Sequence, residues 1–230
     1  MGKTVAQIAT YPPREEMLRR SLATIAPQVD QVRLCLNEYT EVPAFLNAMK
    51  NVEAFIPEVD YKDVGKFATT PRSDDLVFFV DDDILYSEDF VSRMTQIGAK
   101  VGLDKNVFGV HGTIYGTGIR TSKLERKVYN YKYPLKATIP VEQLGTGTMM
   151  ALGKNVAPLD FMLGSQKFVD VRYARWLYQR GITSWAVSRS RGFASGIDRE
   201  EDGHETIWKT FTKNTPEHVF DEIRVFAKNK

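Results

Sequence analysis

Three consecutive aspartates, Asp81, Asp82 and Asp83, are the residues whose type and spacing point most clearly to chemistry. They directly follow Leu76–Val80, an aliphatic and aromatic run without helical periodicity, which predicts a buried strand. Ligands of open α/β sheets collect beyond the carboxyl ends of the strands. If the chain is still extended there, Asp81 and Asp83, two residues apart, point their carboxylates the same way. Two hard oxygen ligands on one side favour Mg²⁺ or Mn²⁺ carrying phosphates.

The alternative for this acidic cluster is a turn that caps the next helix. That helix has a predicted start of its own, with Ser87 as the cap residue and with Glu88 and Asp89 in the first turn. The cap therefore does not need the three aspartates, and the metal–phosphate interpretation is favoured.

The bulk composition fits one large domain with a substantial core. The chain has 230 residues, 43% of them hydrophobic, and a net charge of +2, which neither demands nor excludes a nucleic-acid partner. The single cysteine, Cys35, cannot form an internal disulfide and suits a reducing compartment. Because no apolar stretch approaches the roughly 18 residues of a membrane span and the N-terminus lacks a signal-like region, we expect a soluble, cytoplasmic protein.

The first half of the chain alternates predicted strands and helices. This order predicts right-handed βαβ units and a mostly parallel sheet. The predicted strands are 5–9, 31–36, 52–56, 76–80 and 107–110, and the helical segments are 14–25, 43–49 and 88–101.

The second half is more mixed, and we expect it to complete the same domain. Residues 113–137 are rich in Gly, Tyr and Lys and show no clear period. The predicted strands are 138–141, 148–152 and 183–188, and the predicted helices are 168–180, 207–211 and 217–226.

Several short polar motifs follow one another along the chain: Thr10 with Arg14, and the segments 63–67, 80–86, 108–112, 145–148 and 168–170. In type and order they resemble the motifs of GT-A-type glycosyltransferases, in particular the family-two-like bacterial enzymes that build surface polysaccharides. The resemblance covers roughly residues 5–182 and depends most on the order of the motifs. It implies a single GT-A-like α/β domain over residues 1–230, with a nucleotide-sugar donor half at 1–112 and an acceptor half with C-terminal helices at 113–230.

The resemblance also implies a role for individual residues. Asp170 would be the catalytic base, although relatives often carry Glu-Asp where this chain has Val169 and Asp170; the alternative for Asp170 is a carboxylate favoured by the helix dipole. The metal, Mn²⁺ or Mg²⁺, would be bound by Asp83, Asp81 and His204. The nucleotide-sugar would be bound by Thr10, Arg14, Asp63, Lys66, Asp81 and Asp82, and the acceptor by His111, Gly145, Thr146, Arg126 and Lys127.

Two of the histidines have ordinary structural interpretations as well. His111 follows a predicted strand and can equally be a hydrogen-bonded structural residue, and His204 lies in a polar stretch that can be a plain surface loop. Arg189 and Arg191 follow the last predicted strand and would either touch a diphosphate or form a solvated turn.

The implied reaction moves a sugar from a nucleoside-diphosphate sugar, with a UDP-sugar favoured, to an acceptor hydroxyl. Arginines and a divalent cation offset charge on the leaving diphosphate, one carboxylate takes the hydroxyl proton, and direct displacement inverts the anomeric centre. Glycoside hydrolysis is disfavoured because adjacent aspartates are too close to flank a sugar. A nucleotidyltransferase is disfavoured because its glycine-rich N-terminal loop is missing, and a non-catalytic nucleotide- or glycan-binding module remains an alternative.

A basic, tyrosine-rich segment at residues 120–136 bears on the acceptor. It holds six cations against one acid, with Tyr129, Tyr131 and Tyr133 alternating among them. This composition suits a glycan acceptor such as a surface-polysaccharide precursor. It equally suits nucleic acid, which keeps a glycosyltransferase acting on modified DNA open, and a solvated loop is the ordinary interpretation.

Overall fold

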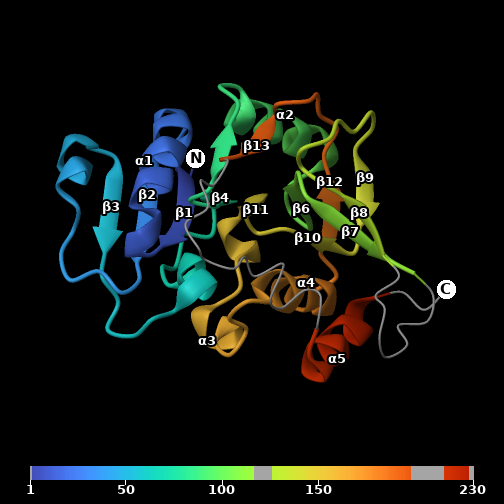
Figure 1. The fold of residues 1–230 in the computed structure, drawn as a ribbon. Coiled ribbons are helices and arrows are strands. Elements are labelled where there is room, and N and C mark those ends of the chain that lie inside the picture. The colour runs from blue at the N-terminus through green and yellow to red at the C-terminus, as the bar shows by residue number, and fades with distance from the viewer. Residues whose placement is uncertain (1, 117–125, 198–214, 228–230) are drawn as a thin grey trace.

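The fold is built on one central sheet of eight strands (Figure 1), in the order β3-β2-β1-β4-β11-β6-β12-β9. The structure is a computed structural model and describes residues 2–116, 126–197 and 215–227. The predicted helix at 207–211 and His204 lie outside these residues. The strands are β1 (Thr4–Thr10), β2 (Gln31–Leu36), β3 (Val52–Phe55), β4 (Leu76–Val80), β6 (Asn106–Gly109), β9 (Ile139–Val141), β11 (Thr148–Leu152) and β12 (Thr183–Ala186).

Most neighbours in this sheet run parallel, as predicted. β1 pairs in parallel with β2 and β4, β2 with β3, and β6 with β12. β11 is antiparallel to both β4 and β6, and β9 is antiparallel to β12. Strands from both halves of the chain thus interleave in one mixed α/β sheet.

The register of β11 against β4 brings a second polar segment to the acidic cluster. Thr148 at the start of β11 lies opposite Val80 at the end of β4. The turn that precedes β11 therefore lies at the same sheet edge as the three aspartates that follow Val80.

Helices cover both faces of the sheet, and the side chains of β4 alternate between the two cores. Phe78 and Val80 pack in the core under α1 (Glu15–Ile25) and α2 (Phe90–Val101). Val77 and Phe79 face the opposite core, under α3 (Leu159–Met162) and α4 (Val169–Gln179). Apolar residues on both faces explain why this strand is a continuous hydrophobic run.

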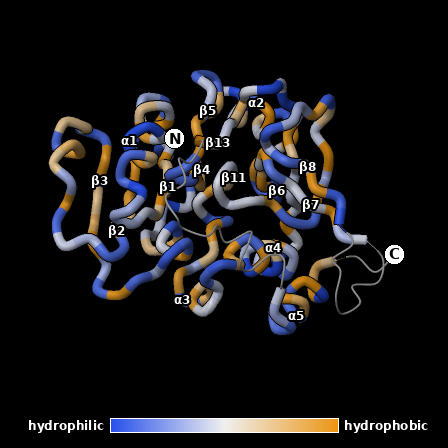
Figure 2. The backbone as a smooth tube through the Cα atoms, in the orientation of Figure 1, coloured by the Kyte–Doolittle hydropathy of each residue, from blue (hydrophilic) through white to orange (hydrophobic). Residues whose placement is uncertain are grey.

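A last helix, α5 (Glu217–Phe226), packs on α4 rather than on the sheet (Figure 1). Both helices alternate hydrophobic and hydrophilic residues along the chain (Figure 2), as expected of helices with one buried face. The bounds of α5 match the prediction, and α4 differs from it by one residue at each end.

Two small sheets stand beside the central one, and the sequence did not predict their strands. β7 (Gly112–Tyr115) pairs with β8 (Arg126–Tyr129) and with β10 (Gln143–Leu144), and β5 (Ile84–Tyr86) pairs with β13 (Ala194–Gly196). These strands have three or four residues at most, too few for an alternating pattern to emerge. Part of the basic segment therefore forms a strand, β8.

The start of α2 differs from the prediction. The helix begins at Phe90 with Asp89 as its N-cap residue, and the Ser87 hydroxyl donates to the Asp89 carboxylate at 2.7 Å instead of capping. The conclusion about the aspartates is unaffected, because β5 separates them from this helix. Among the described residues, no helix combines the length and the apolarity needed to cross a bilayer.

Candidate active site

A cavity of about 980 Å³ opens beyond the carboxyl ends of β1, β2 and β4. Its walls come from the loops after these strands, from the 3₁₀ turn η4 (Lys62–Phe67), from the turn before β11 and from the start of α4. It collects nearly all the predicted site residues that the structure describes: Thr10, Arg14, Asp63, Lys66, Asp81, Asp82, Asp83, His111, Gly145, Thr146 and Asp170.

The three aspartates separate into two kinds. The side chains of Asp81 and Asp83 are 37% and 25% exposed, whereas that of Asp82 is only 3% exposed. Asp81 and Asp83 therefore present carboxylates to the cavity, and Asp82 supports the wall behind them.

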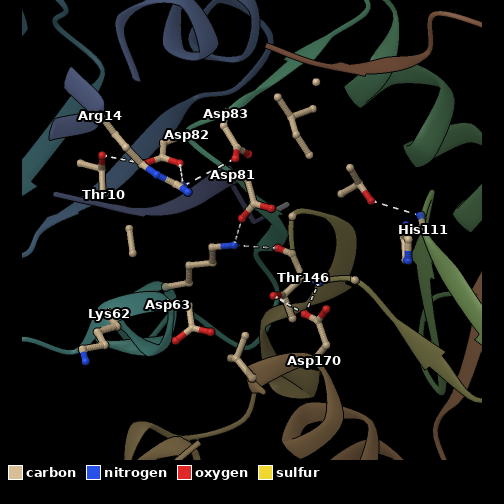
Figure 3. A pocket seen from close by; sticks show the side chains of 18 of the residues that line it. Thr10, Arg14, Lys62, Asp63, Asp81, Asp82, Asp83, His111, Thr146 and Asp170 are labelled. Atoms are coloured by element: carbon tan, nitrogen blue, oxygen red, sulfur yellow. Dashed lines mark hydrogen bonds and ion pairs between the residues drawn. The ribbon is translucent and has the colours of Figure 1, made fainter. Parts of the chain in front are cut away.

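Asp82 holds the two residues of the β1 loop that were predicted to bind nucleotide. Its carboxylate accepts from the Thr10 hydroxyl and from the Arg14 guanidinium, each at 2.7 Å (Figure 3). Burial raises the pKa of Asp82 to about 6, against the opposing effect of Arg14. Arg14 also lies 3.6 Å from Asp83, so it links two of the three aspartates.

Lys66 lies at the centre of the site as a buried cation. Its ammonium forms an ion pair with Asp81 and contacts the Thr146 carbonyl at 3.4 Å (Figure 3). Burial works to lower the pKa of Lys66, but the nearby carboxylates, above all Asp81, raise it. A side chain added at Gly147 would collide with the second carboxylate oxygen of Asp81, so a larger residue at this position would have to displace that carboxylate.

Asp170, the predicted base, is fixed by the turn before β11. Its Oδ1 accepts from the Thr146 backbone N–H at 2.8 Å and from the Thr146 hydroxyl at 2.7 Å (Figure 3). Asp170 is partly exposed in the cavity, whereas Thr146 is 2% exposed. Thr146, predicted to contact the acceptor, thus orients Asp170 and bridges it to Lys66.

Asp63, predicted to bind the nucleotide, lines the cavity and also joins two of its loops. Both of its carboxylate oxygens accept from the backbone N–H of Lys167, each at 3.0 Å, which ties η4 to the loop before α4. Burial raises the pKa of Asp63 to about 6, while the Lys167 hydrogen bonds and the Lys66 charge act in the opposite direction.

Three residues with strained backbones line the cavity, and the sequence did not predict them as site residues. Glu38, Lys62 and Lys167 have φ values of 61°, 51° and 75°, and they are the non-glycine residues with positive φ among those described. Such strain clusters at functional sites. Asn37 joins the loop after β2 to the turn at Lys62, since its side-chain amide donates to the Lys62 carbonyl at 3.0 Å.

Only some of these cavity residues could have been predicted from their positions in the sequence. Asn37 and Glu38 directly follow the predicted strand 31–36, the position where ligands of such sheets collect. Lys62 and Lys167 follow no predicted strand, and only the folded chain brings them to the cavity.

His111 lines the far side of the cavity, where its ring lies 6.1 Å from that of Tyr131. Burial lowers the pKa of His111, the neighbouring cations Arg189 and Arg126 add to this, and Asp170 opposes it. Gly145 packs against His111, and a methyl group added at Gly145 would lie in tight contact with the histidine Cβ, at 3.2 Å.

The basic segment contributes to the cavity, but not through the residues that were predicted. Arg126 and Lys127 lie on β8 and are not among the lining residues, whereas Asn130, Tyr131 and Lys132 are. Residues 120–125 lie outside those described.

Arg189, one of the two arginines considered for the diphosphate, is directed at backbone carbonyl groups in this structure. It is 5% exposed, and its guanidinium donates to the carbonyls of Tyr133 at 3.0 Å and Asn130 at 2.8 Å. Burial lowers its pKa to about 10. The residue holds the 130–132 loop against the cavity.

The donor set suits a metal carried by phosphates better than a metal held by protein alone. Among residues 2–116, 126–197 and 215–227, no three His, Cys, Asp or Glu side chains cluster closely enough to bind an ion. Asp81 and Asp83 offer hard oxygens at the cavity wall, and Mg²⁺ is commonly bound by one or two carboxylates together with substrate phosphates.

The overall fold is similar to solved glycosyltransferase structures. TarS of S. aureus, residues 1–349 in complex with UDP-GlcNAc, superposes with a TM-score of 0.63 at 11% identity over 97% of this chain and 65% of that chain. The chain has the GT-A-type fold. The same TarS segment in a structure of its own gives a TM-score of 0.52 at 14% identity, over 82% of this chain and 59% of that one.

A longer TarS structure gives a TM-score of 0.52 at 10% identity over 85% of this chain and 37% of that one. The chain therefore spans less than two thirds of the length of these TarS chains. No protein-family model matches the chain, and no curated protein matches its sequence.

The first prediction concerns the glycine against Asp81. Gly147→Ala should lower the free energy of unfolding by about 1–3 kcal/mol, because the new methyl group must displace the Asp81 carboxylate or the turn. Gly145→Ala is the matched comparison, since its methyl group would lie 3.2 Å from the His111 Cβ, a tight contact that a small shift can relieve, and it should therefore cost less. Urea unfolding of both variants measures the difference, and equal losses would contradict this account of Gly147.

The second prediction concerns the partly buried carboxyl of Asp63. Its folded pKa of about 6 exceeds the value of 3.8 expected when unfolded, so the proton stabilises the fold below about pH 4, and this is lost as pH rises through 6. Asp63→Asn removes this dependence. Between pH 4 and pH 7 the free energy of unfolding of the native protein should therefore fall by up to about 3 kcal/mol more than that of the variant. Urea titrations giving parallel pH profiles would show that Asp63 is not perturbed.

Proposed function

We propose that this chain is a metal-dependent glycosyltransferase that moves a sugar from a UDP-sugar to an acceptor hydroxyl with inversion at the anomeric carbon. The observation that carries the proposal is the cavity itself. It brings Asp81 and Asp83 at the end of β4 together with Asp170 at the start of α4, with Thr146 between the two groups. The GT-A-type fold and the UDP-GlcNAc bound by the similar TarS structure support the same conclusion.

Asp81, Asp83 and Arg14 form the part of the site suited to the diphosphate. The two carboxylates supply hard oxygen ligands for Mn²⁺ or Mg²⁺, and Arg14 supplies a fixed positive charge held by Asp82. A divalent cation bound there would offset the negative charge that develops on the leaving diphosphate. Arg14 and Lys66 contribute to the same offset from the protein side.

Asp170 is suited to remove the proton of the acceptor hydroxyl. Thr146 donates two hydrogen bonds to Oδ1 and none to Oδ2, which leaves the second oxygen available for the hydroxyl. Attack by that hydroxyl on the anomeric carbon, opposite the diphosphate, forms the new glycosidic bond as the old one breaks. The proton goes to Asp170 and the electron pair leaves with the diphosphate.

The acceptor side of the proposed site is built from His111, Gly145, Tyr131 and Lys132. An aromatic ring next to a cation suits a sugar ring that carries polar or anionic groups. We therefore favour a glycan acceptor, such as a polysaccharide precursor. Arg126 and Lys127, which would track a nucleic-acid backbone, lie outside the cavity lining.

The third prediction tests the function directly. The protein with UDP-GlcNAc and Mn²⁺ should release UDP slowly by transfer to water, and EDTA should abolish the release. Asp83→Ala should lose this activity and keep the native melting temperature, because the Asp83 side chain is 25% exposed and its ion pair with Arg14 is long, at 3.6 Å. The proposal is contradicted if the protein releases UDP from no common UDP-sugar and also fails to bind UDP.

The fourth prediction concerns the base. Asp170→Asn keeps the size of the side chain and one acceptor for Thr146 but cannot take the proton, so transfer to an acceptor should slow by about 10²–10⁴-fold. UDP affinity should change little, as calorimetry would measure. A rate close to that of the native enzyme, or a product with retained anomeric configuration, would assign the base elsewhere.

A further inference from the structure

Lys66 is a buried cation whose carboxylate partner is one of the proposed metal ligands. Its ammonium pairs with Asp81 Oδ1, and its side chain is 4% exposed, against 37% for Asp81. Its other hydrogen bond goes to the Thr146 carbonyl at 3.4 Å. In the described part of the chain no other basic side chain pairs with Asp81, so one lysine already neutralises this carboxylate.

The backbone of Asp81 is held in place next to Lys66. Its backbone N–H donates to the Tyr86 hydroxyl at 2.8 Å, and its carbonyl accepts from the Ser21 hydroxyl at 2.9 Å. Gly147 packs against its second carboxylate oxygen so closely that a methyl group would not fit. A divalent cation that binds Asp81 must therefore approach the carboxylate that Lys66 already holds.

Two cations on one carboxylate repel each other strongly in a partly buried site. A buried ammonium is equally costly when its partner is taken away. Both free-energy costs fall if an anion enters with the metal and forms an ion pair with the Lys66 ammonium. The diphosphate of the donor is such an anion.

We propose that Lys66 competes with the divalent cation for Asp81, and that the donor diphosphate relieves the competition by drawing Lys66 to itself. This inference rests on the proposed function. Lys66 is then a positioning residue that makes the metal bind well only together with the nucleotide. The same exchange moves the ammonium relative to Thr146, whose N–H and hydroxyl hold Asp170.

Linkage makes the exchange measurable. If UDP raises the affinity for Mn²⁺, then Mn²⁺ raises the affinity for UDP by the same factor. Direct contact between metal and phosphate gives part of this coupling, and displacement of Lys66 gives the rest. Removing the lysine charge should therefore raise the affinity for Mn²⁺ alone and reduce the effect of UDP on it.

The fifth prediction uses Lys66→Met, which keeps the length of the side chain and removes its charge. Electron paramagnetic resonance of free Mn²⁺, titrated with the full chain in the absence and presence of UDP, measures the affinity without any turnover. Mn²⁺ alone should bind the variant at least about tenfold more tightly than the native protein, and UDP should improve Mn²⁺ binding less.

Two further variants separate charge from structure. Lys66→Arg keeps the charge and should leave the Mn²⁺ affinity close to native. Lys154→Met removes the exposed ion pair of Lys154 with Asp104, which lies outside the cavity, and should also leave it unchanged. If circular dichroism shows that Lys66→Met is unfolded, Lys66→Gln makes the same test while keeping hydrogen bonds to Asp81 and Thr146.

The inference is overturned if a folded Lys66→Met or Lys66→Gln variant has the same Mn²⁺ affinity as the native protein. This holds whether both proteins bind Mn²⁺ or neither does. The UDP titrations report on the proposed function separately. The loss of Lys66 could tighten Mn²⁺ binding in a protein that binds no UDP. That result would support the competition at Asp81 and would contradict the proposed glycosyltransferase function.

Discussion

The burial of one lysine ammonium among carboxylates organises the whole site. A cation as buried as Lys66 must have partners, and these come from two distant segments: Asp81 after β4 and the Thr146 carbonyl before β11. Both partners reach the same place because β11 runs antiparallel beside β4, with Thr148 opposite Val80. The mixed direction of the central sheet is thus what allows a carboxylate cluster and a glycine-rich turn to meet around one charge.

The site also contains carboxylates whose ionised form is disfavoured by burial. Burial raises the pKa of both Asp63 and Asp82 to about 6, so near neutral pH each carboxylate is kept ionised at a cost to the fold. Each carboxylate in turn forms hydrogen bonds that shape the cavity, since Asp82 fixes Thr10 and Arg14, and Asp63 fixes the loop before α4. The non-glycine residues with positive φ around the same cavity are a further local cost in folding free energy at this site.

Two of the carboxylates that the sequence grouped together have different roles in the fold. Asp81 and Asp82 are adjacent and chemically identical, yet one faces the cavity beside Lys66 and the other lies behind the wall, because side chains of successive residues near a strand end point to opposite sides. Asp63 and Thr146 were also predicted as ligand contacts. In the structure both line the cavity, and their hydrogen bonds also position Lys167 and Asp170.

The sequence by itself predicted most strands and helices of the central sheet and the end of β4 as the place for chemistry, because long apolar patterns and the polar residues that follow them are local signals. Most of the other predicted site residues came from the resemblance to GT-A-type glycosyltransferases, and Lys62 and Lys167 were not predicted. It did not determine the short strands β5, β7, β8, β10 and β13, whose pairing depends on distant partners. Nor did it reveal that Arg189 holds the 130–132 loop, or that Lys66 meets Asp81. Only the tertiary structure decided which charge pairs with which, since burial and pairing are properties of segments far apart in the chain.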